Sequence, residues 1–209
     1  MPATLPNGIP IPELDINFVP AKAGEVLKLG PLTCRIMEDG SNTGKFHNFS
    51  AVLTWSDLFL DNRLGVAELI MPPKTPGPPP HWHEMHDETF FVTKGNVRFH
   101  VPEVGNPGVD KKVTDAKVGD YMVVPIRAPH TFSNPFDEEA RMFFTSTPSF
   151  YINYFKLLST MGEEGKPMPA EVSMTAMAMY ATTVVDKQPR KAPERAGLAE
   201  WIFRIDDNA

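Results

Sequence analysis

Short segments that alternate between hydrophobic and polar residues fill the first three quarters of the chain. Turn-forming residues separate the segments, among them the proline-rich stretch 72–80 and the Gly95–Asn96 pair. Alternation with a period of two, bounded by glycine and proline, is typical of the strands of a sandwich or barrel. The pattern predicts strands at residues 25–27, 32–37, 50–53, 64–71, 88–94, 97–101, 109–114, 121–124, 130–133 and 141–147.

The spacing of apolar residues changes to a helical one after Pro148. A helix is predicted within residues 149–162, with Ser149 as its N-cap and Gly162 just past its end. A second helix is predicted within residues 169–185, which begin with a proline suited to a first helical turn. The last quarter of the chain is therefore expected to be helical.

The length of the chain limits its domain organisation. With 209 residues, of which 42% are hydrophobic, it can bury one substantial core. We predict a proline-rich N-terminal arm at residues 1–30, a barrel at residues 31–148 and a helical extension at residues 149–209. An apolar patch at residues 198–203 is expected to dock on the body. The predicted fold class is all-β with a C-terminal helical extension.

Charge and cysteine content narrow the classes of partner. The net charge of −6, without a run of lysine or arginine, argues against a nucleic-acid partner. No stretch approaches the roughly 18 apolar residues of a membrane span, and the N-terminal sequence lacks the order of a secretion signal. The single cysteine, Cys34, excludes an intramolecular disulfide and fits a reducing compartment. We expect a soluble, cytoplasmic protein.

Residues 78–95 gather histidine and glutamate beside a hydrophobic run. His81 and His83 are two residues apart, which on a strand puts both side chains on one face, as two ligands of one ion require. Glu88 begins the apolar run that follows. An acid on an apolar inner face needs a compensating partner, and a cation held by the two histidines supplies one. The stretch therefore predicts a metal site.

The face on which Glu88 lies follows from a predicted hairpin closed by residues 95–96. In that register Glu88 shares the inner face with Phe90, Val92 and Phe99. The acid is thus predicted to point into the barrel.

The remaining histidines differ in their suitability as ligands. His130 lies far along the chain, between prolines and a short aromatic strand, and a rigidly held imidazole there is a suitable ligand. His86 lies in a turn and can face either the ion or solvent, so it receives a minor role. His47 and His100 are interpreted as ordinary surface or strand residues, and the hairpin register puts His100 on the opposite face.

The order and spacing of these residues resemble the two motifs of the cupin family. His81, His83, Glu88 and Gly95 are similar to the first motif, and Gly119, Pro125, His130 and Asn134 to the second. The resemblance implies a double-stranded β-helix, or jelly-roll, barrel that holds a metal ion near one mouth. It also implies the ligand set His81, His83, Glu88 and His130.

Two positions depart from the family motifs. Arg127 stands where the second motif has a glycine, and Thr75 stands where the first motif begins with one. Either the turn differs or Arg127 adopts a strained conformation. At the mouth of the barrel, Arg127 would be placed to meet an anionic group.

Three imidazoles and one carboxylate suit one divalent first-row metal ion and leave positions open for substrate, water or dioxygen. These ligand types do not distinguish among Fe, Mn, Ni, Cu, Co and Zn as the bound metal. The walls of the cavity are expected to include Phe90, Val92, Phe99, Tyr121, Met122, Phe132 and, at the mouth, Arg127.

Residues 77–95 are most similar to the quercetin 2,3-dioxygenase-like cupins, which act on flavonols and other phenolic or polyketide-like aromatics. The resemblance implies a dioxygenase for a hydroxylated aromatic or enolic substrate, with Glu88 as catalytic base. A metal-assisted cyclase, isomerase or decarboxylase of a secondary-metabolite intermediate stays open, as does a non-enzymatic small-molecule-binding cupin. A homodimer that covers the sheet edges is expected.

Overall fold

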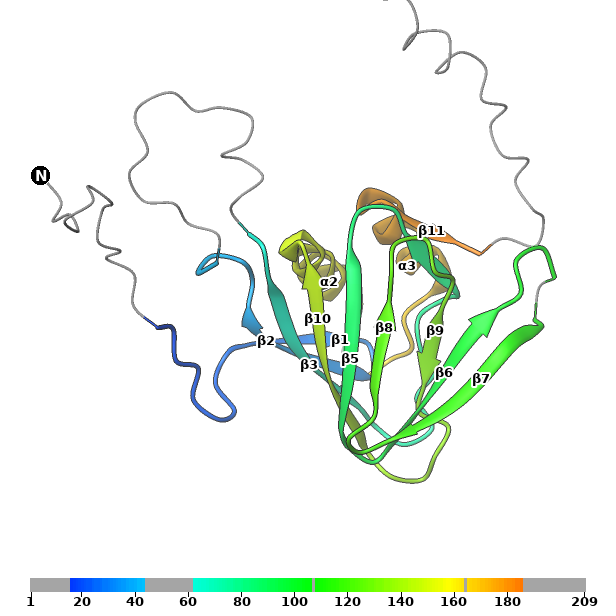
Figure 1. The fold of residues 1–209 in the computed structure, drawn as a ribbon, viewed down its shortest axis with the longest axis horizontal. Coiled ribbons are helices and arrows are strands. Elements are labelled where there is room, and N and C mark those ends of the chain that lie inside the picture. Colours follow the sequence, from blue (N-terminus) through cyan, green and yellow to red (C-terminus); the bar gives the residue numbers. More distant parts are fainter. Residues whose placement is uncertain (1–15, 44–61, 107, 164, 186–209) are drawn as a thin grey trace, which may run out of the picture.

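The computed structural model describes residues 16–43, 62–106, 108–163 and 165–185. The predicted strand 50–53, His47 and the apolar patch at 198–203 lie outside these residues. Within them the chain forms two facing layers of strands, and α2, α3 and β11 lie together at one end of the barrel (Figure 1). The fold is mostly β, consistent with a double-stranded β-helix, and it has a helical C-terminal part, as predicted.

Six strands form the larger layer, in the order β1-β2-β3-β10-β5-β8, and all neighbours are antiparallel. Their bounds are β1 Glu25–Leu29, β2 Leu32–Glu38, β3 Gly65–Met71, β10 Ala140–Thr147, β5 Asp87–Lys94 and β8 Tyr121–Val124. β3 and β10 alternate strictly between buried and less buried positions, as their sequence pattern requires. The predicted strands within the described residues are present, and the division of the chain into arm, barrel and extension stays a prediction.

The second layer contains a three-stranded and a two-stranded sheet, β7-β6-β9 and β11-β4. Their bounds are β7 Asp110–Lys117, β6 Asn96–Pro102, β9 Thr131–Ser133, β4 His81–His83 and β11 Thr182–Val184. Two backbone hydrogen bonds join them, from His81 N to His130 O at 3.0 Å and from His130 N to His81 O at 2.8 Å. The second layer therefore runs continuously from β7 to β11.

The predicted hairpin between β5 and β6 is wrong. β5 pairs with β10 and β8, whereas β6 pairs with β7 and β9, so the chain crosses from one layer to the other at Gly95. Gly95 has φ 64°, and a Cβ there would lie 2.6 Å from the carbonyl oxygen of Glu139. Glycine is therefore required at a barrel corner rather than in a hairpin loop. Phe90, Val92 and Phe99 nevertheless point inward, as predicted.

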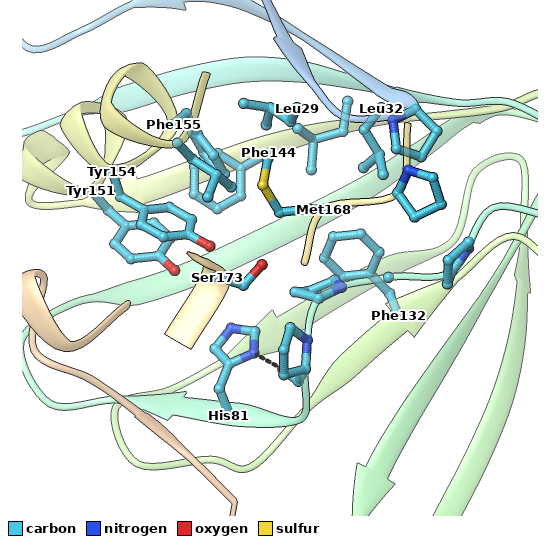
Figure 2. A pocket seen from close by; sticks show the side chains of 18 of the residues that line it. Leu29, Leu32, His81, Phe132, Phe144, Tyr151, Tyr154, Phe155, Met168 and Ser173 are labelled. Atoms are coloured by element: carbon cyan, nitrogen blue, oxygen red, sulfur yellow. Dashed lines mark hydrogen bonds between the residues drawn. The ribbon is translucent and has the colours of Figure 1, made fainter. Parts of the chain in front are cut away.

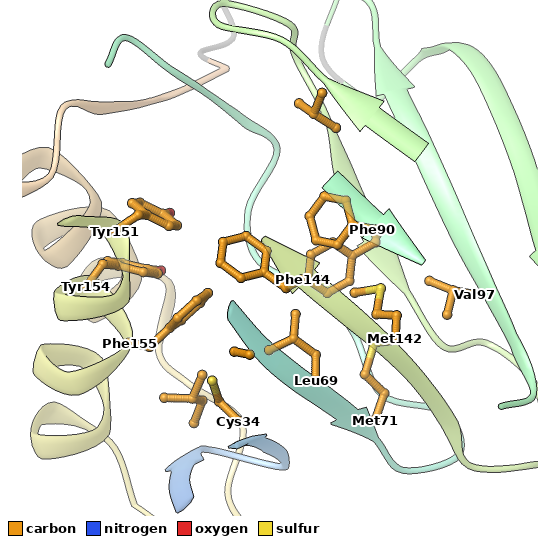
Figure 3. Packing of buried hydrophobic residues seen from close by; sticks show 14 of the residues in the cluster. Cys34, Leu69, Met71, Phe90, Val97, Met142, Phe144, Tyr151, Tyr154 and Phe155 are labelled. Carbon is orange, nitrogen blue, oxygen red and sulfur yellow. The ribbon is translucent and has the colours of Figure 1, made fainter. Parts of the chain in front are cut away.

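The core lies between the two layers and continues toward the helices (Figure 3). Phe90 is in its middle, with its ring centroid 5.5 Å from that of Phe99 and 5.6 Å from those of Phe132 and Phe144. Tilted aromatic rings at these separations pack favourably. Cys34 is fully buried at the edge of this core, and burial raises the pKa of its thiol to about 12.

The helical part starts with a 3-10 turn, η1 Ser149–Tyr151, followed directly by α2 Ile152–Met161 and then α3 Ala170–Met179. The predicted N-cap is wrong: Pro148 precedes the 3-10 turn, and the buried Ser149 hydroxyl has no hydrogen-bond partner among the residues that the structure describes. Gly162 follows the end of α2, as predicted. Among the described residues no helix is long and apolar enough to cross a membrane.

The second helix is shorter than predicted because its last residues form a strand. α3 ends at Met179, Ala181 has φ 50°, and β11 follows at once. Thr182, Thr183 and Val184 are β-branched, and this favours a strand when a partner edge is available. β4 supplies that edge, with Thr182 opposite His83.

An ion-pair cluster attaches α2 to the larger sheet. Lys156 Nζ lies 3.0 Å from Asp39 Oδ2 and 3.2 Å from Glu25 Oε2. Hydrogen bonding from Ser41 and Lys156 lowers the pKa of Asp39 from its ordinary 3.8 to about 2. The folded state therefore favours the ionised carboxylate.

We predict that Asp39→Asn lowers the free energy of unfolding by roughly 0.5–1 kcal/mol near neutral pH, because the ion pair is partly exposed. A depressed folded-state pKa contributes stability above the unfolded-state value. The difference from the natural protein should therefore shrink as pH falls from about 4 toward about 2. Urea unfolding across this range measures it, with Asp137→Asn, in an exposed ion pair with Lys74, as the control. A constant difference at all pH values would contradict the assignment.

Candidate metal centre

Four imidazoles and one carboxylate meet inside the barrel, near the end that carries the helices. They belong to His81, His83, His86, Glu88 and His130, and none is more than 4% exposed. β4 turns His81 and His83 inward and Trp82 outward, where the indole Nε1 donates to Glu84 Oε1 at 2.9 Å. Glu88 is the first inward residue of β5. The structure thus brings together the four residues predicted as ligands, together with His86.

The proline-rich segment before β4 is fixed against β9. The Thr131 hydroxyl donates to the Pro78 carbonyl at 2.7 Å. A Cβ on Gly77 would lie 1.5 Å from the Phe132 carbonyl oxygen, so only glycine allows this close approach. The segment therefore enters β4 along one path, which sets the position of His81.

The carboxylate of Glu88 lies between three imidazoles. Its Oε2 atom is 3.2 Å from the Nε2 atoms of both His83 and His130, and its Oε1 atom is 3.1 Å from His86 Nε2. Two groups have all their ligand atoms within 4.8 Å of one another: His81, His83 and His130 in one, and His83, His86 and Glu88 in the other. This spacing allows several of the atoms to bind one ion.

Hydrogen bonds to Nδ1 orient three of the imidazoles. His81 Nδ1 lies 2.7 Å from the Pro79 carbonyl oxygen (Figure 2), and His130 Nδ1 lies 3.0 Å from that of Ala128. A carbonyl only accepts, so each Nδ1 carries the proton and each Nε2 keeps its lone pair. His83 Nδ1 lies 2.9 Å from the Thr182 hydroxyl, which donates to the Tyr180 carbonyl at 3.2 Å. Because the Thr182 hydroxyl uses its proton on Tyr180, it accepts the proton of His83 Nδ1, and His83 Nε2 also keeps its lone pair.

Three buried nitrogen atoms at the centre lack a hydrogen-bond partner within the described residues. They are His86 Nδ1 and the Nε2 atoms of His83 and His130. The two Nε2 atoms lie 3.2 Å from Glu88 Oε2 but not in hydrogen-bond geometry. A buried polar atom without a partner costs about 1–3 kcal/mol. A cation held by the two Nε2 atoms and the carboxylate would satisfy these two nitrogens, so the residues fit a divalent metal ion.

Electrostatics favours the ligand form of each group. Burial holds the pKa of His81 well below its ordinary value and also lowers the pKa of His83, so both imidazoles are neutral. Burial alone would raise the pKa of Glu88, but His83, His130 and His86 outweigh it and hold that pKa well below its ordinary value. Neutral imidazole and ionised carboxylate are the forms that bind metal.

His86 lies inside the centre, which the sequence left undecided. Its side chain is fully buried and its ring centroid is 4.2 Å from that of Tyr151. It contacts the oxygen of Glu88 that faces away from His83 and His130. Because Tyr151 comes from the helical part, no local signal in residues 81–88 could have indicated this placement.

A cavity of about 350 Å³ lies beside the centre (Figure 2). His81 and Glu88 line it at the metal side, and Tyr151, Tyr154 and Phe155 line it at the helical side. Most of the other lining residues are apolar. The sequence did not indicate that the two tyrosines line the cavity, because the spacing of apolar residues in a helix does not show which of its faces covers the barrel.

Five of the seven residues predicted as cavity walls lie in the core or pack against it, and only two of these five line the cavity. Phe90 and Phe132 line the cavity. Val92 and Phe99 are buried in the core and Met122 packs against it, but these three do not line the cavity. Their strand positions are inward, but they lie deeper in the barrel than the cavity.

Tyr121 and Arg127 lie outside the barrel instead. Tyr121 is 58% exposed, because it pairs with the outward-facing Phe91 in the β5-β8 ladder. Arg127 has φ 65°, the conformation that a glycine would adopt without strain, and its Nε atom donates to Glu84 Oε2 at 2.7 Å. His100 also lies away from the centre and contacts Asp110 at 2.7 Å.

Comparison with known proteins supports the same superfamily as the motifs. Residues 67–146 match the family model described as "Cupin domain". No curated protein sequence matches the chain significantly. The domain match includes His81, His83, Glu88 and His130.

Several solved structures are similar in fold. KdgF from Halomonas sp. has 14% identity and a TM-score of 0.45 over 64% of this chain and 94% of its own. The polyketide cyclase RemF from Streptomyces resistomycificus has 18% identity and a TM-score of 0.44 over 65% and 80%. An RmlC-like cupin from Shewanella frigidimarina has 18% identity and a TM-score of 0.41 over 64% and 92%.

We predict that Thr182→Val weakens metal binding roughly 10- to 100-fold, because partners that orient a ligating histidine contribute about that much to affinity. The variant removes the acceptor of His83 Nδ1 and keeps the shape of the side chain. Competition of Co²⁺ or Zn²⁺ between the protein and a chelating dye measures the affinity. Thr182→Ser should restore it, and Thr183→Val, one residue along β11, is the matched control. Equal affinities for Thr182→Val and Thr183→Val would contradict this role.

Proposed function

We propose that this chain, whose fold and domain match support the cupin superfamily, is a metal-dependent dioxygenase acting on a hydroxylated aromatic substrate of flavonol or polyketide-like type. The supporting observation is that the imidazole and carboxylate cluster lies at one side of an apolar cavity. A ligand in that cavity can present an oxygen to the cluster while its ring system is shielded from water.

The proposed reaction assigns separate tasks to the chain's own residues. When bound, a divalent ion supplies Lewis-acid chemistry that makes a coordinated hydroxyl more acidic. Glu88, held in its ionised form, is positioned to accept the hydroxyl proton. His86 contacts Oε1 and leaves Oε2 facing His83 and His130. Phe90, Phe132 and the other apolar walls exclude water from the substrate ring.

Two alternatives use the same cavity. A cyclase, isomerase or decarboxylase of a secondary-metabolite intermediate would need the same Lewis acid and base but no dioxygen. A passive binding protein would have no need for buried Nε2 atoms without partners, and these atoms argue for the enzymatic alternatives. Simultaneous measurement of oxygen consumption and substrate loss separates the dioxygenase from the cyclase, isomerase or decarboxylase. Stoichiometric uptake supports the dioxygenase, and substrate loss without uptake contradicts it.

Metal dependence is tested most directly by metal content. Protein purified without a histidine tag should contain about one first-row divalent ion per chain by mass spectrometry. His81→Ala should lose most of it, because one of the converging imidazoles is removed. His100→Ala, a histidine paired with Asp110 outside the centre, is the matched control and should retain the metal. Equal metal content in the two variants would reject the proposed site.

The role of Glu88 is tested by Glu88→Gln. We expect this variant to keep its fold and part of its metal but to lose turnover about 10²- to 10⁴-fold, because the amide cannot accept the proton. Oxygen uptake and substrate loss with a panel of flavonols and catechols measure turnover. Glu84→Gln is the control, because Glu84 pairs with Arg127 outside the cavity. Full activity in Glu88→Gln would remove Glu88 as the base.

A further inference from the structure

We propose that the helical part of the chain forms a ligand subsite in which the Tyr154 hydroxyl, held by Tyr151, binds an uncharged, mainly apolar ring compound. The inference deepens the proposed function, on which it rests for the assumption that the ligand is the substrate. Binding to the subsite itself does not require the metal. The inference can therefore be tested separately.

The two tyrosines form a rigid pair. Tyr151 ends the 3-10 turn and Tyr154 lies in the first turn of α2. Their rings stack with centroids 4.7 Å apart and an interplanar angle of 16°, and they are 3% and 4% exposed. The Tyr151 ring also packs edge-on against His83 at 4.7 Å. The pair is thus held between α2 and the metal centre.

Both hydroxyls point into the cavity, toward the side where Ser173 of α3 contributes a third hydroxyl (Figure 2). Burial raises the pKa of Tyr151 and of Tyr154 well above the ordinary value, and the nearby carboxylate of Glu88 acts in the same direction. The phenols therefore stay protonated at physiological pH. The Tyr151 hydroxyl is hydrogen-bonded to Thr182 and to Tyr154, so Tyr154 is the phenol available to a hydroxyl or carbonyl oxygen of a ligand.

The charges around the cavity disfavour an anionic ligand in this part of it. Among the described residues that line the cavity there is no lysine or arginine, and Glu88 is the ionised group. Arg127, which the sequence placed at the mouth, is ion-paired with Glu84 outside. An anionic substituent near the tyrosines would lose its hydration without gaining a counter-charge, which is unfavourable.

The walls and the volume favour a small flat molecule. Aromatic and aliphatic side chains line most of the rest of the cavity, among them Phe132, Phe144, Phe155, Leu158 and Met168. The volume of about 350 Å³ is at the lower end of the roughly 300–1,000 Å³ typical of small-molecule sites. The cavity thus has room for one compact ring system but not for an oligomer.

The experiment compares 2-naphthol with 2-naphthoate, which share a ring system and differ in charge. Titration calorimetry with metal-free protein should give at least tenfold tighter binding of 2-naphthol. Tyr154→Phe should weaken 2-naphthol binding roughly three- to tenfold, because one hydrogen bond is lost. Tyr121→Phe, which changes a tyrosine on the outer face, is the matched control and should leave binding unchanged. Equal or tighter binding of 2-naphthoate, or equal effects of the two tyrosine variants, would overturn the proposal.

A cavity-filling variant checks the location. Met168 lies in the segment before α3 and lines the cavity, so Met168→Trp should reduce 2-naphthol binding more than tenfold. Met161→Trp, at the partly exposed end of α2, should not. Unchanged binding in Met168→Trp would place the ligand elsewhere and overturn the inference. Binding of 2-naphthol without any turnover of phenols would reject the proposed dioxygenase and leave the subsite standing.

Discussion

The two backbone hydrogen bonds between His81 and His130 are the interaction on which the candidate site depends. They join β4 to β9 and place two histidines from opposite ends of the domain side by side, with ring centroids 4.5 Å apart. Without this bridge the second layer would end at β9, and His83 would not be held opposite Glu88. The same contact therefore completes the barrel wall and assembles the imidazoles.

The helical part of the chain acts on this centre from two sides. Thr182 of β11 orients the His83 imidazole, and Tyr151 packs against both His83 and His86. The same segment contributes the tyrosine wall of the cavity. The extension is therefore a structural component of the site and of the space beside it, although it lies outside the residues that match the cupin domain.

The sequence predicted the features that depend on local periodicity and motif spacing. Alternation located the strands, and the spacing of His81, His83, Glu88 and His130 indicated a cluster that the structure brings together. Features that depend on packing between distant segments were missed. Gly95 turns a corner because of its contact with Glu139, and β11 forms because β4 offers an edge. The ligand roles, the metal identity and the homodimer stay predictions.

Thr182 is synthesised long after His83, the histidine that it orients. During synthesis, residues 81–83 leave the ribosome roughly a hundred residues before their edge partner, since Thr182 and His83 are 99 positions apart. Domains generally fold as units as they emerge. The nascent barrel can close while the His83 imidazole still lacks the contact that orients it. A metal ion that binds this centre would therefore reach its full affinity only after the β11 segment has paired with β4.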